Sequence, residues 1–222
     1  MPAGGTFTLA NATLDSAGET KAISSRNADY GDIVIDNATV NGGIYLYKGS
    51  SDTSDNGDVT VTDSTVNGKI TYSNYVKTTA DSALVVSDST VTGGISYRGT
   101  GNASVGTQST RSLSARVAPN PQYSTVVIDN VVSNSNLSFT NVNVEITDTE
   151  ISFVYSNLPA ILTVSGGTAN ISGLTVDVDY NSEPIRITQS MTFSSGAQVE
   201  FTDCTIDIYH ARTSDLRVAG MN

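Results

Sequence analysis

The chain repeats one short pattern of residues, and this repeat restricts the possible fold more than any other feature. Asp32–Ile44, Asp58–Ser73 and Ala83–Ile95 each contain a short apolar alternation, an Asn or Asp break, a Thr and a second alternation. Alternation with a period of two predicts a β-strand, and an Asx-rich break predicts a turn. Self-similarity at a nearly constant spacing indicates an architecture in which each unit stacks on the next.

The repeat occurs eight times when the copies are aligned on the apolar residue that opens the second alternation. These residues are Leu14, Val40, Val66, Val91, Val132, Ile151, Val176 and Ile206. The intervals between them are 26, 26, 25, 41, 19, 25 and 30 residues, so the fourth interval contains an insertion, an additional coil or both. The Val132 copy fits least well, because the neighbouring apolar residues allow two registers.

Later copies of the repeat add a third strand. Leu162–Val176 and Met191–Ile206 both read as strand, Ser/Gly turn, strand, Gly/Asp turn and strand. Three short strands in each repeat of roughly 20–30 residues describe one coil of a parallel β-helix. No stretch of ten or more residues shows helical periodicity. The sequence therefore predicts an all-β fold over residues 1–222, a right-handed parallel β-helix or single-stranded β-solenoid with three short strands per coil.

Two files of side chains are expected to face the same side of the third strand. The first file is aliphatic and runs through Ile44, Ile70, Ile95 and Leu137. The second file, two residues later, is largely aromatic and runs through Leu46, Tyr72, Tyr97 and Phe139. We expect these aromatic rings to pack inside the coil, although an exposed platform for sugar rings is the alternative. Tyr45 and Tyr47 point the opposite way, so we expect them to be exposed.

Polar residues form two further columns. Asn11, Asn37, Asp63, Asp88, Asp148 and Asp203 occupy equivalent turns, with Gly173 as a substitute. We expect exposed turn residues with left-handed torsions rather than a Ca²⁺ ladder, since the Gly-Gly-x-Gly-x-Asp motif is absent. The adjacent column consists of Thr13, Thr39, Thr65, Thr90, Thr175 and Thr205, interrupted at Val131 and Glu150. The regular display of Asn37, Thr39, Asp63, Thr65, Asp88 and Thr90 makes this side a candidate binding surface.

Two segments break the rhythm of the repeat. Residues 49–57 form a polar stretch without strand signal, and residues 99–122 form a longer insertion. Arg111 and Arg116 in the insertion, together with Arg98 before it, are three of the eleven basic residues of the chain. Long loops on a rigid scaffold are functional or disordered, so these three residues form a second candidate binding site, and Tyr45 and Tyr47 are separate candidates.

Composition excludes several classes of function. The net charge of −11 and the isoelectric point near 4.2 make nucleic acid a poor partner. His210 is the only His and Cys204 the only Cys, which leaves no matched base for nucleophilic catalysis. We find no phosphate-binding loop, no zinc spacing and no transmembrane stretch. The sequence predicts no catalytic residues, no metal site and no cofactor, and Cys204 is expected to be a packed thiol.

The Leu162–Val176 run and the Asp-Ser-Thr-Val-x-Gly-x-Ile copies at 63–70 and 88–95 resemble the passenger domains of bacterial autotransporters. Those domains are parts of self-secreting outer-membrane proteins, and the resemblance covers nearly all of the chain. It implies a β-helix at the bacterial cell surface or outside the cell that acts as an adhesin or self-association module. The implied partners are another copy of the chain, a host extracellular-matrix protein or a glycan. Neither end carries a cap, so we expect a fragment of a longer exported protein.

Two other classes share the β-helix and stay open. Pectate lyases and phage tailspikes act on polysaccharides, with Ca²⁺-bound Asp beside a basic residue or with paired carboxylates in a groove. Asp63, Asp88 and Asp148 supply carboxylates, whereas Lys69 and Arg98 are expected on another strand. A structural stalk is the second alternative, because no sequence feature separates a stalk from an adhesive face.

Overall fold

The computed structural model describes residues 5–18, 20–26, 31–48, 57–74, 82–99, 123–155, 160–180, 191–209 and 218–219. Within these ranges the chain forms strands, turns and bends, and no helix. All pairings among the described strands are parallel. Each strand pairs with its equivalent one repeat later, which is the hydrogen-bonding pattern of a β-solenoid and confirms the predicted fold class.

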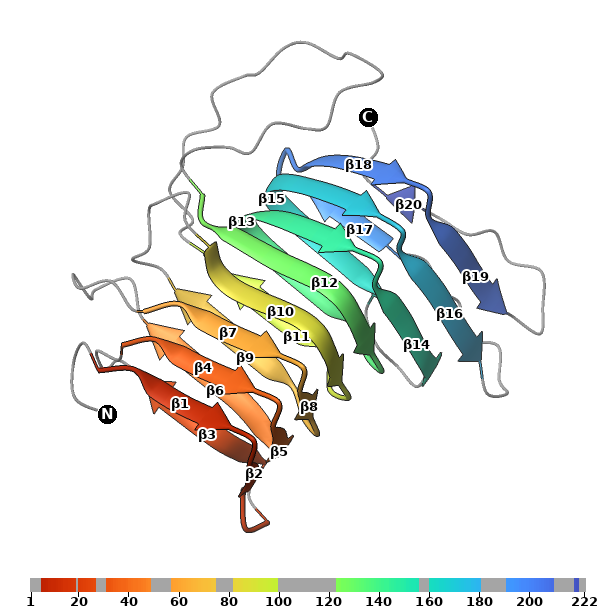
Figure 1. The fold of residues 1–222 in the computed structure, drawn as a ribbon. Helices are drawn as coiled ribbons and strands as arrows, with labels where there is room; N and C mark the ends of the chain where they lie inside the picture. Colours follow the sequence, from red (N-terminus) through yellow and green to blue (C-terminus); the bar gives the residue numbers. More distant parts are fainter. Residues whose placement is uncertain are drawn as a thin grey trace.

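The strands form three stacks, which we name A, B and C in the order in which each coil passes through them (Figure 1). Stack A consists of β1 (Phe7–Ala10), β4 (Ile33–Asp36), β7 (Val59–Thr62), the first parts of β10 (Ser82–Val91) and β12 (Thr125–Ser133), the second parts of β13 (Leu137–Thr147) and β15 (Leu162–Ser172), and β18 (Gln198–Thr202). Stack B consists of β2 (Thr13–Asp15), β5 (Thr39–Asn41), β8 (Thr65–Val66), the ends of β10 and β12, β14 (Glu150–Tyr155), β16 (Thr175–Tyr180) and β19 (Thr205–Tyr209). Stack C consists of β3 (Lys21–Arg26), β6 (Gly43–Lys48), β9 (Ile70–Asn74), β11 (Ile95–Arg98), the first parts of β13 and β15, β17 (Met191–Ser194) and β20 (Val218–Ala219).

The coil is right-handed, as predicted. In Figure 1 the chain advances from the lower left to the upper right as it turns around the axis. Strands of stack A run down to the right on the near side, and the fainter strands of stack C return behind them. Eight coils with strands about 4.8 Å apart give a rod roughly 40 Å long.

Inward-facing side chains form ladders along the axis, because equivalent strands are in register. In stack A, Val59 pairs with Ile33 and Leu84, and all three are fully buried. The aliphatic file of stack C is buried at Ile44, Ile70, Ile95, Leu137 and Leu162. The file beside it is buried at Leu46, Tyr72, Tyr97, Phe139 and Val164. The Tyr72 and Tyr97 rings meet edge to face, with centroids 5.2 Å apart, so the prediction of interior aromatics is confirmed.

The predicted register of the fifth coil is wrong by one residue in stack B. Val91 pairs with Ser133, and Ser133 pairs with Ile151, so Ser133 holds the core position that the sequence assigned to Val132. Val132 faces outward and is 36% exposed. The reason is that the A–B turn has a fixed length. Because the Ile128 side chain faces the core, the next strand residue that faces the core is at position 133. The coil lengths measured at this ladder become 42 and 18 residues instead of 41 and 19.

The three corners of the coil differ in how much their length varies. The corner between stacks A and B has the same form in each of the eight coils, with one residue of positive φ followed by one residue that turns toward stack B. The corner between stacks C and A carries both the 49–57 loop and the 99–122 insertion. Apart from Gly57 and Gly99, these two predicted segments lie outside the described residues.

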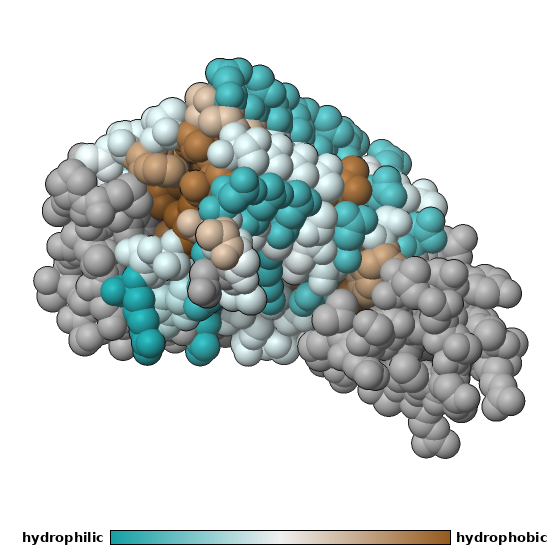
Figure 2. Space-filling view, turned by 90° about the horizontal axis from the view of Figure 1, so that it is seen from below, coloured by the Kyte–Doolittle hydropathy of each residue, from teal (hydrophilic) through white to brown (hydrophobic). Residues whose placement is uncertain are grey.

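Hydrophilic side chains and side chains of intermediate hydropathy cover much of the outer surface. Figure 2 shows them over the coloured part of the face seen from below, with apolar side chains gathered on the side where the N-terminal coil lies. Phe7, Leu9 and Leu14 belong to this coil, where they pack against the core and are only partly buried. Among the other described residues, Val132 is the large apolar side chain that stands exposed.

Candidate functional site

The structure divides the predicted binding residues among three parts of the coil. The first part is the A–B corner, which holds Asn37, Asp63 and Asp88. The second is the outer surface of stack B, which holds Thr39, Thr65 and Thr90. The third is the outer surface of stack C, which holds Tyr45, Tyr47 and Arg98. Arg111 and Arg116 lie outside the described residues.

The A–B corner is a column of left-handed backbone torsions. Its φ values lie between 45° and 63° at Asn11, Asn37, Asp63, Asp88, Asn130, Asp148, Gly173 and Asp203. Gly, Asn and Asp adopt this conformation most readily, which confirms the predicted turn role. The Asn37 Nδ2 donates to Asn11 Oδ1 at 2.7 Å, and the Asn130 Nδ2 donates to Asp88 Oδ1 at 2.6 Å. Backbone conformation and hydrogen bonding therefore account for the composition of this column, including Asn130, which sequence analysis missed.

The Thr column lies on the outer surface of stack B. Thr39, Thr65 and Thr90 pair in register and are half-buried. The column is interrupted at Val132 and Glu150, whereas the sequence placed the first interruption at Val131, which is buried. This surface therefore mixes hydroxyl, apolar and acidic side chains.

Charged residues of the described chain are sorted by stack. The strands of stack C contain no acidic residue, whereas acidic residues such as Glu145, Glu150 and Glu200 lie on stacks A and B or at the corners beside them. The basic residues within the described ranges all lie on strands of stack C or directly before one, namely Lys21, Arg26, Lys48, Lys69 and Arg98. In a chain with a net charge of −11, this sorting gives stack C a locally positive character.

Two contacts between cations and tyrosines mark the first coils of this surface. The Lys21 Nζ lies 4.0 Å from the centroid of the Tyr45 ring. The Arg26 guanidinium carbon lies 5.8 Å from the centroid of the Tyr47 ring. Such contacts hold a cation over an aromatic face and place both groups together at the surface.

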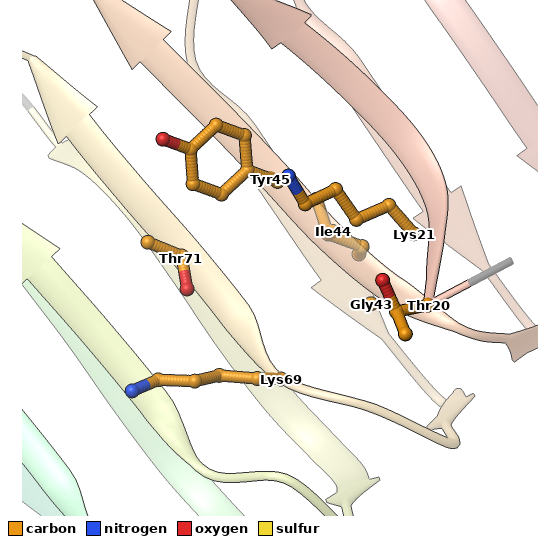
Figure 3. Close-up of a pocket in the computed structure, with 7 residues that line it drawn as sticks. All are labelled: Thr20, Lys21, Gly43, Ile44, Tyr45, Lys69 and Thr71. Atoms are coloured by element: carbon orange, nitrogen blue, oxygen red, sulfur yellow. The ribbon is translucent and has the colours of Figure 1, made fainter.

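A shallow hollow of about 130 Å³ lies beside Tyr45 (Figure 3). Gly43 forms part of its lining, and a Cβ atom there would approach the Lys69 carbonyl oxygen to 2.9 Å. Lys21 and Lys69 come from the two coils on either side of Gly43. Lys21, Lys69, Thr20 and Thr71 therefore all contribute to the lining of the hollow; the Lys21 ammonium lies beside Tyr45, and the Lys69 side chain extends away from it.

Hydroxyl side chains dominate the rest of the outer surface of stack C. The outward positions from the third to the seventh coil hold Thr71, Ser73, Ser96, Arg98, Ser138, Thr140, Thr163, Ser165, Thr192 and Ser194. The Ser194 Oγ donates to the Ser165 Oγ at 3.1 Å, so neighbouring coils also interact through this file. Hydroxyls both donate and accept hydrogen bonds, which suits a polar ligand that lies along the rod.

The sequence pattern indicates Tyr45, Tyr47 and Arg98 as candidate binding residues, but it does not indicate Lys21 and Arg26. The strand Lys21–Arg26 has a register irregularity between Lys21 and Ile23, and Ile23 is its one large aliphatic residue. Period-two alternation therefore did not mark it as a strand. Extending the Ile44 and Leu46 alternation one coil upstream, onto Ile23 and Ser25, is the signal that finds it.

Within the described part of the chain, no three His, Cys, Asp or Glu side chains are placed to hold a metal ion. The Cys204 thiol lies 3.3 Å from the Thr202 carbonyl oxygen and 3.7 Å from that of Ile171, at a position packed against the core. His210 lies outside the described residues. The arrangement on stack C can bind a ligand through charge, aromatic contact and hydrogen bonds.

Comparisons with known protein families, characterised proteins and solved structures found no match. In the ranges that the structure describes, no helix has the length and apolar character needed to cross a membrane.

Proposed function

We propose that this chain is an adhesive module of a bacterial cell surface, of the autotransporter passenger kind, and that it binds an extended partner through the outer surface of stack C. The observation that carries the proposal is the sorting of charge, which leaves this surface basic in an acidic protein. A parallel stack repeats each outward position about every 4.8 Å. A partner with its own repeat can then make many weak, equivalent contacts, which add up to useful avidity.

The other two candidate surfaces support the proposal less well. At the A–B corner, positive φ already requires Asn, Asp or Gly, so the identity of Asn37, Asp63 and Asp88 carries no separate information about a ligand. On stack B the hydroxyl column is broken by Val132 and Glu150. Neither surface combines cations, aromatic rings and hydroxyls as stack C does.

The geometry favours binding over catalysis. A polysaccharide hydrolase needs paired carboxylates on either side of the scissile bond. The described strands of stack C carry no carboxylate, and the hollow beside Tyr45 is shallow. A passive stalk does not require basic and acidic residues to lie on different surfaces. The separation of charge therefore favours adhesion over a stalk.

Display of the chain on a non-adherent bacterium tests the proposal. We expect the displayed chain to cause settling of the cells or their retention on matrix-coated or glycan-coated surfaces. Thr71→Glu with Thr163→Glu places two carboxylates on stack C and should abolish the effect. The matched control, Thr8→Glu with Thr13→Glu, places the same charges on stacks A and B, in files that already contain Glu145 and Glu150.

Three results would count against adhesion through stack C. Equal adhesion by both variants would show that the binding surface is not stack C. A wild-type chain that causes neither settling nor retention would favour the stalk. Release of reducing sugars from a panel of polysaccharides would favour an enzyme.

A further inference from the structure

We infer that the partner of stack C is an acidic polysaccharide, whose carboxylate or sulfate groups contact Lys21, Arg26, Lys69 and Arg98. This inference rests on the proposed function and adds the chemistry of the ligand. It follows from the spacing of the four cations, from the groups between them and from the distance to the acidic surfaces.

The four cations form two files along the rod. Lys21 and Lys69 border the Gly43 hollow from coils two strand spacings apart, which is about 10 Å. Arg26 and Arg98 share one outward file through Tyr47 and Ser73, three spacings or about 14 Å apart. Duplex DNA carries a charge about every 1.7 Å of axis, far denser than these cations. A chain of sugars in which charged and neutral groups alternate matches the observed spacing better.

The groups between the cations suit the neutral parts of such a chain. Tyr45 and Tyr47 offer aromatic rings with a polar tip, and Thr71, Ser73 and Ser96 offer hydroxyls. The hollow of about 130 Å³ is smaller than the roughly 300–1,000 Å³ of pockets that enclose a small ligand. A ligand that lies along the surface, with one charged substituent in the hollow, fits this shape.

The overall negative charge does not prevent this contact at physiological salt. The Debye length there is about 8 Å, and opposing sheets are separated by about 10 Å of core. A ligand on stack C is therefore largely screened from Glu145, Glu150 and Glu200 on the other stacks. Because the remaining attraction comes from exposed cations, binding should weaken steeply as salt is added.

A second copy of the chain is the competing partner, because its acidic surfaces complement stack C. Such a contact joins two different surfaces and therefore builds open filaments rather than closed dimers. Long-range repulsion by the net charge of −11 acts on both kinds of partner and does not separate them. A second copy, however, carries its acidic residues at fixed positions on a rigid rod, whereas a flexible polysaccharide can adjust its charged groups to the four cations, and for this reason we favour it.

Binding of the purified chain to four immobilised probes tests the inference. Hyaluronate carries one carboxylate in each disaccharide, chondroitin sulfate carries a sulfate in addition, dextran is neutral, and duplex DNA is a dense polyanion. We expect binding to one or both acidic polysaccharides, weakened at least fivefold between 50 and 300 mM NaCl, as a roughly linear fall of log affinity with log salt requires. The two acidic probes separate carboxylate from sulfate recognition. Dextran and DNA should bind at least tenfold more weakly.

A pair of variants with equal net charge connects binding to stack C. Lys21→Gln with Lys69→Gln lowers the charge by two and should weaken binding to the preferred polysaccharide at least fivefold. Thr8→Glu with Thr13→Glu lowers the charge by the same amount on the other stacks, and its affinity should stay within twofold of the wild type. Melting followed by far-UV circular dichroism verifies that both variants are folded.

Several results would overturn the inference. Equal binding to dextran or DNA would do so, as would equal loss of affinity in both variants. Self-association in sedimentation that Lys21→Gln with Lys69→Gln abolishes, without polysaccharide binding, would identify a second copy as the partner. If no acidic probe binds while displayed cells still adhere through stack C, the inference fails and the proposed function stands. If displayed cells also fail to adhere, both fail.

Discussion

At the scale of single residues, the A–B corner shows how backbone conformation selects side chains that then interact along the axis. The column holds amides, carboxylates and one glycine, and two of its four carboxylates, Asp148 and Asp203, have no carboxylate neighbour in the adjacent coil. Asp63 and Asp88 are the exception, because they lie in consecutive coils about 4.8 Å apart. Like charges directly opposite each other on neighbouring strands are destabilising.

The first prediction is that Asp88→Asn stabilises the rod by about 1 kcal/mol, the usual net contribution of one hydrogen bond. The new amide can donate to Asp63 as Asn37 donates to Asn11, and it can still accept from Asn130. The positive φ suits Asn and Asp equally. A thermal melt should show a midpoint roughly 2–4 °C higher.

Asp203→Asn is the matched control for this prediction. Asp203 has the same conformation, but its neighbour in the preceding coil is Gly173, which has no side chain to accept a hydrogen bond. The control should leave the melting midpoint within about 1 °C of the wild type. Equal stabilisation by both substitutions would show that net charge, rather than the Asp63–Asp88 contact, is responsible.

The second prediction concerns the ladder in stack B. Val66 is fully buried between Val40 and Val91, so Val66→Asp places a charge where nothing can pair with it. We expect a loss of about 3–5 kcal/mol, with loss of strand signal in far-UV circular dichroism. Thr65→Asp, one residue earlier and outward, should melt close to the wild type. An unchanged spectrum for Val66→Asp would contradict the inward register.

At the scale of elements, the sequence was sufficient wherever a strand carries two aliphatic residues two positions apart. The Ile33–Ile35, Val59–Val61 and Leu84–Val86 pairs are all buried, because alternation and burial coincide there. The fifth coil misled the alignment because a hydrophobic residue, Val132, lies outside and a polar one, Ser133, lies inside. Buried Ser133 donates to the Ser135 carbonyl oxygen at 2.9 Å, a partner that alternation cannot reveal.

The third prediction separates the two registers of this coil. Val132→Lys should be tolerated, since position 132 faces outward and pairs with position 150, where Glu150 provides an opposite charge. Ser133→Lys should unfold the neighbouring coils, because position 133 is fully buried. Comparing the urea midpoints of the two variants tests the assignment. If the Val132 variant is the less stable one, the register inferred from alternation was correct after all.

The candidate site was less accessible from the sequence than the fold. The basic residues are seen to share one surface only when all strands of stack C are aligned in register. The register irregularity in β3 prevents this alignment from the sequence alone. Buried polar residues also interrupt the alternation of apolar and polar residues along the strands. Asn143 is buried, donates to the Tyr123 carbonyl oxygen at 3.0 Å and accepts from Thr168 at 2.9 Å. Pairing across coils, rather than local pattern, determines which side such residues face.

At the scale of the whole molecule, stability depends on interfaces between neighbouring coils. In a solenoid each repeat contacts only the next, so no single ligand or distant contact holds the rod together. The A–B corner contributes to these interfaces through backbone hydrogen bonds, and at two of them also through a hydrogen bond between side chains. Positive φ and these hydrogen bonds account for the composition of the corner without requiring a cation.

The fourth prediction follows from this account of the corner. We expect the melting temperature to be the same within about 1 °C with EDTA and with millimolar Ca²⁺, because a cation raises stability only if it binds the folded state. Differential scanning fluorimetry under both conditions is sufficient. A decrease of several degrees in the melting temperature with EDTA would indicate that the Asp residues of the corner bind a metal ion. Mg²⁺ in place of Ca²⁺ serves as the control for ionic strength.

The direction of the hydrogen bonds between coils determines how the rod responds to tension. These bonds run along the axis, so a pull on the two ends of the chain loads the terminal interface first and then each interface in turn. Releasing one coil of 25 or 26 residues frees about 85 Å of extended chain. A module of this kind extends stepwise under flow and dissipates mechanical work. Stretching of single molecules should record a staircase of steps that follow the coil lengths, with equal steps for the first coils and unequal steps for the coils of 42 and 18 residues.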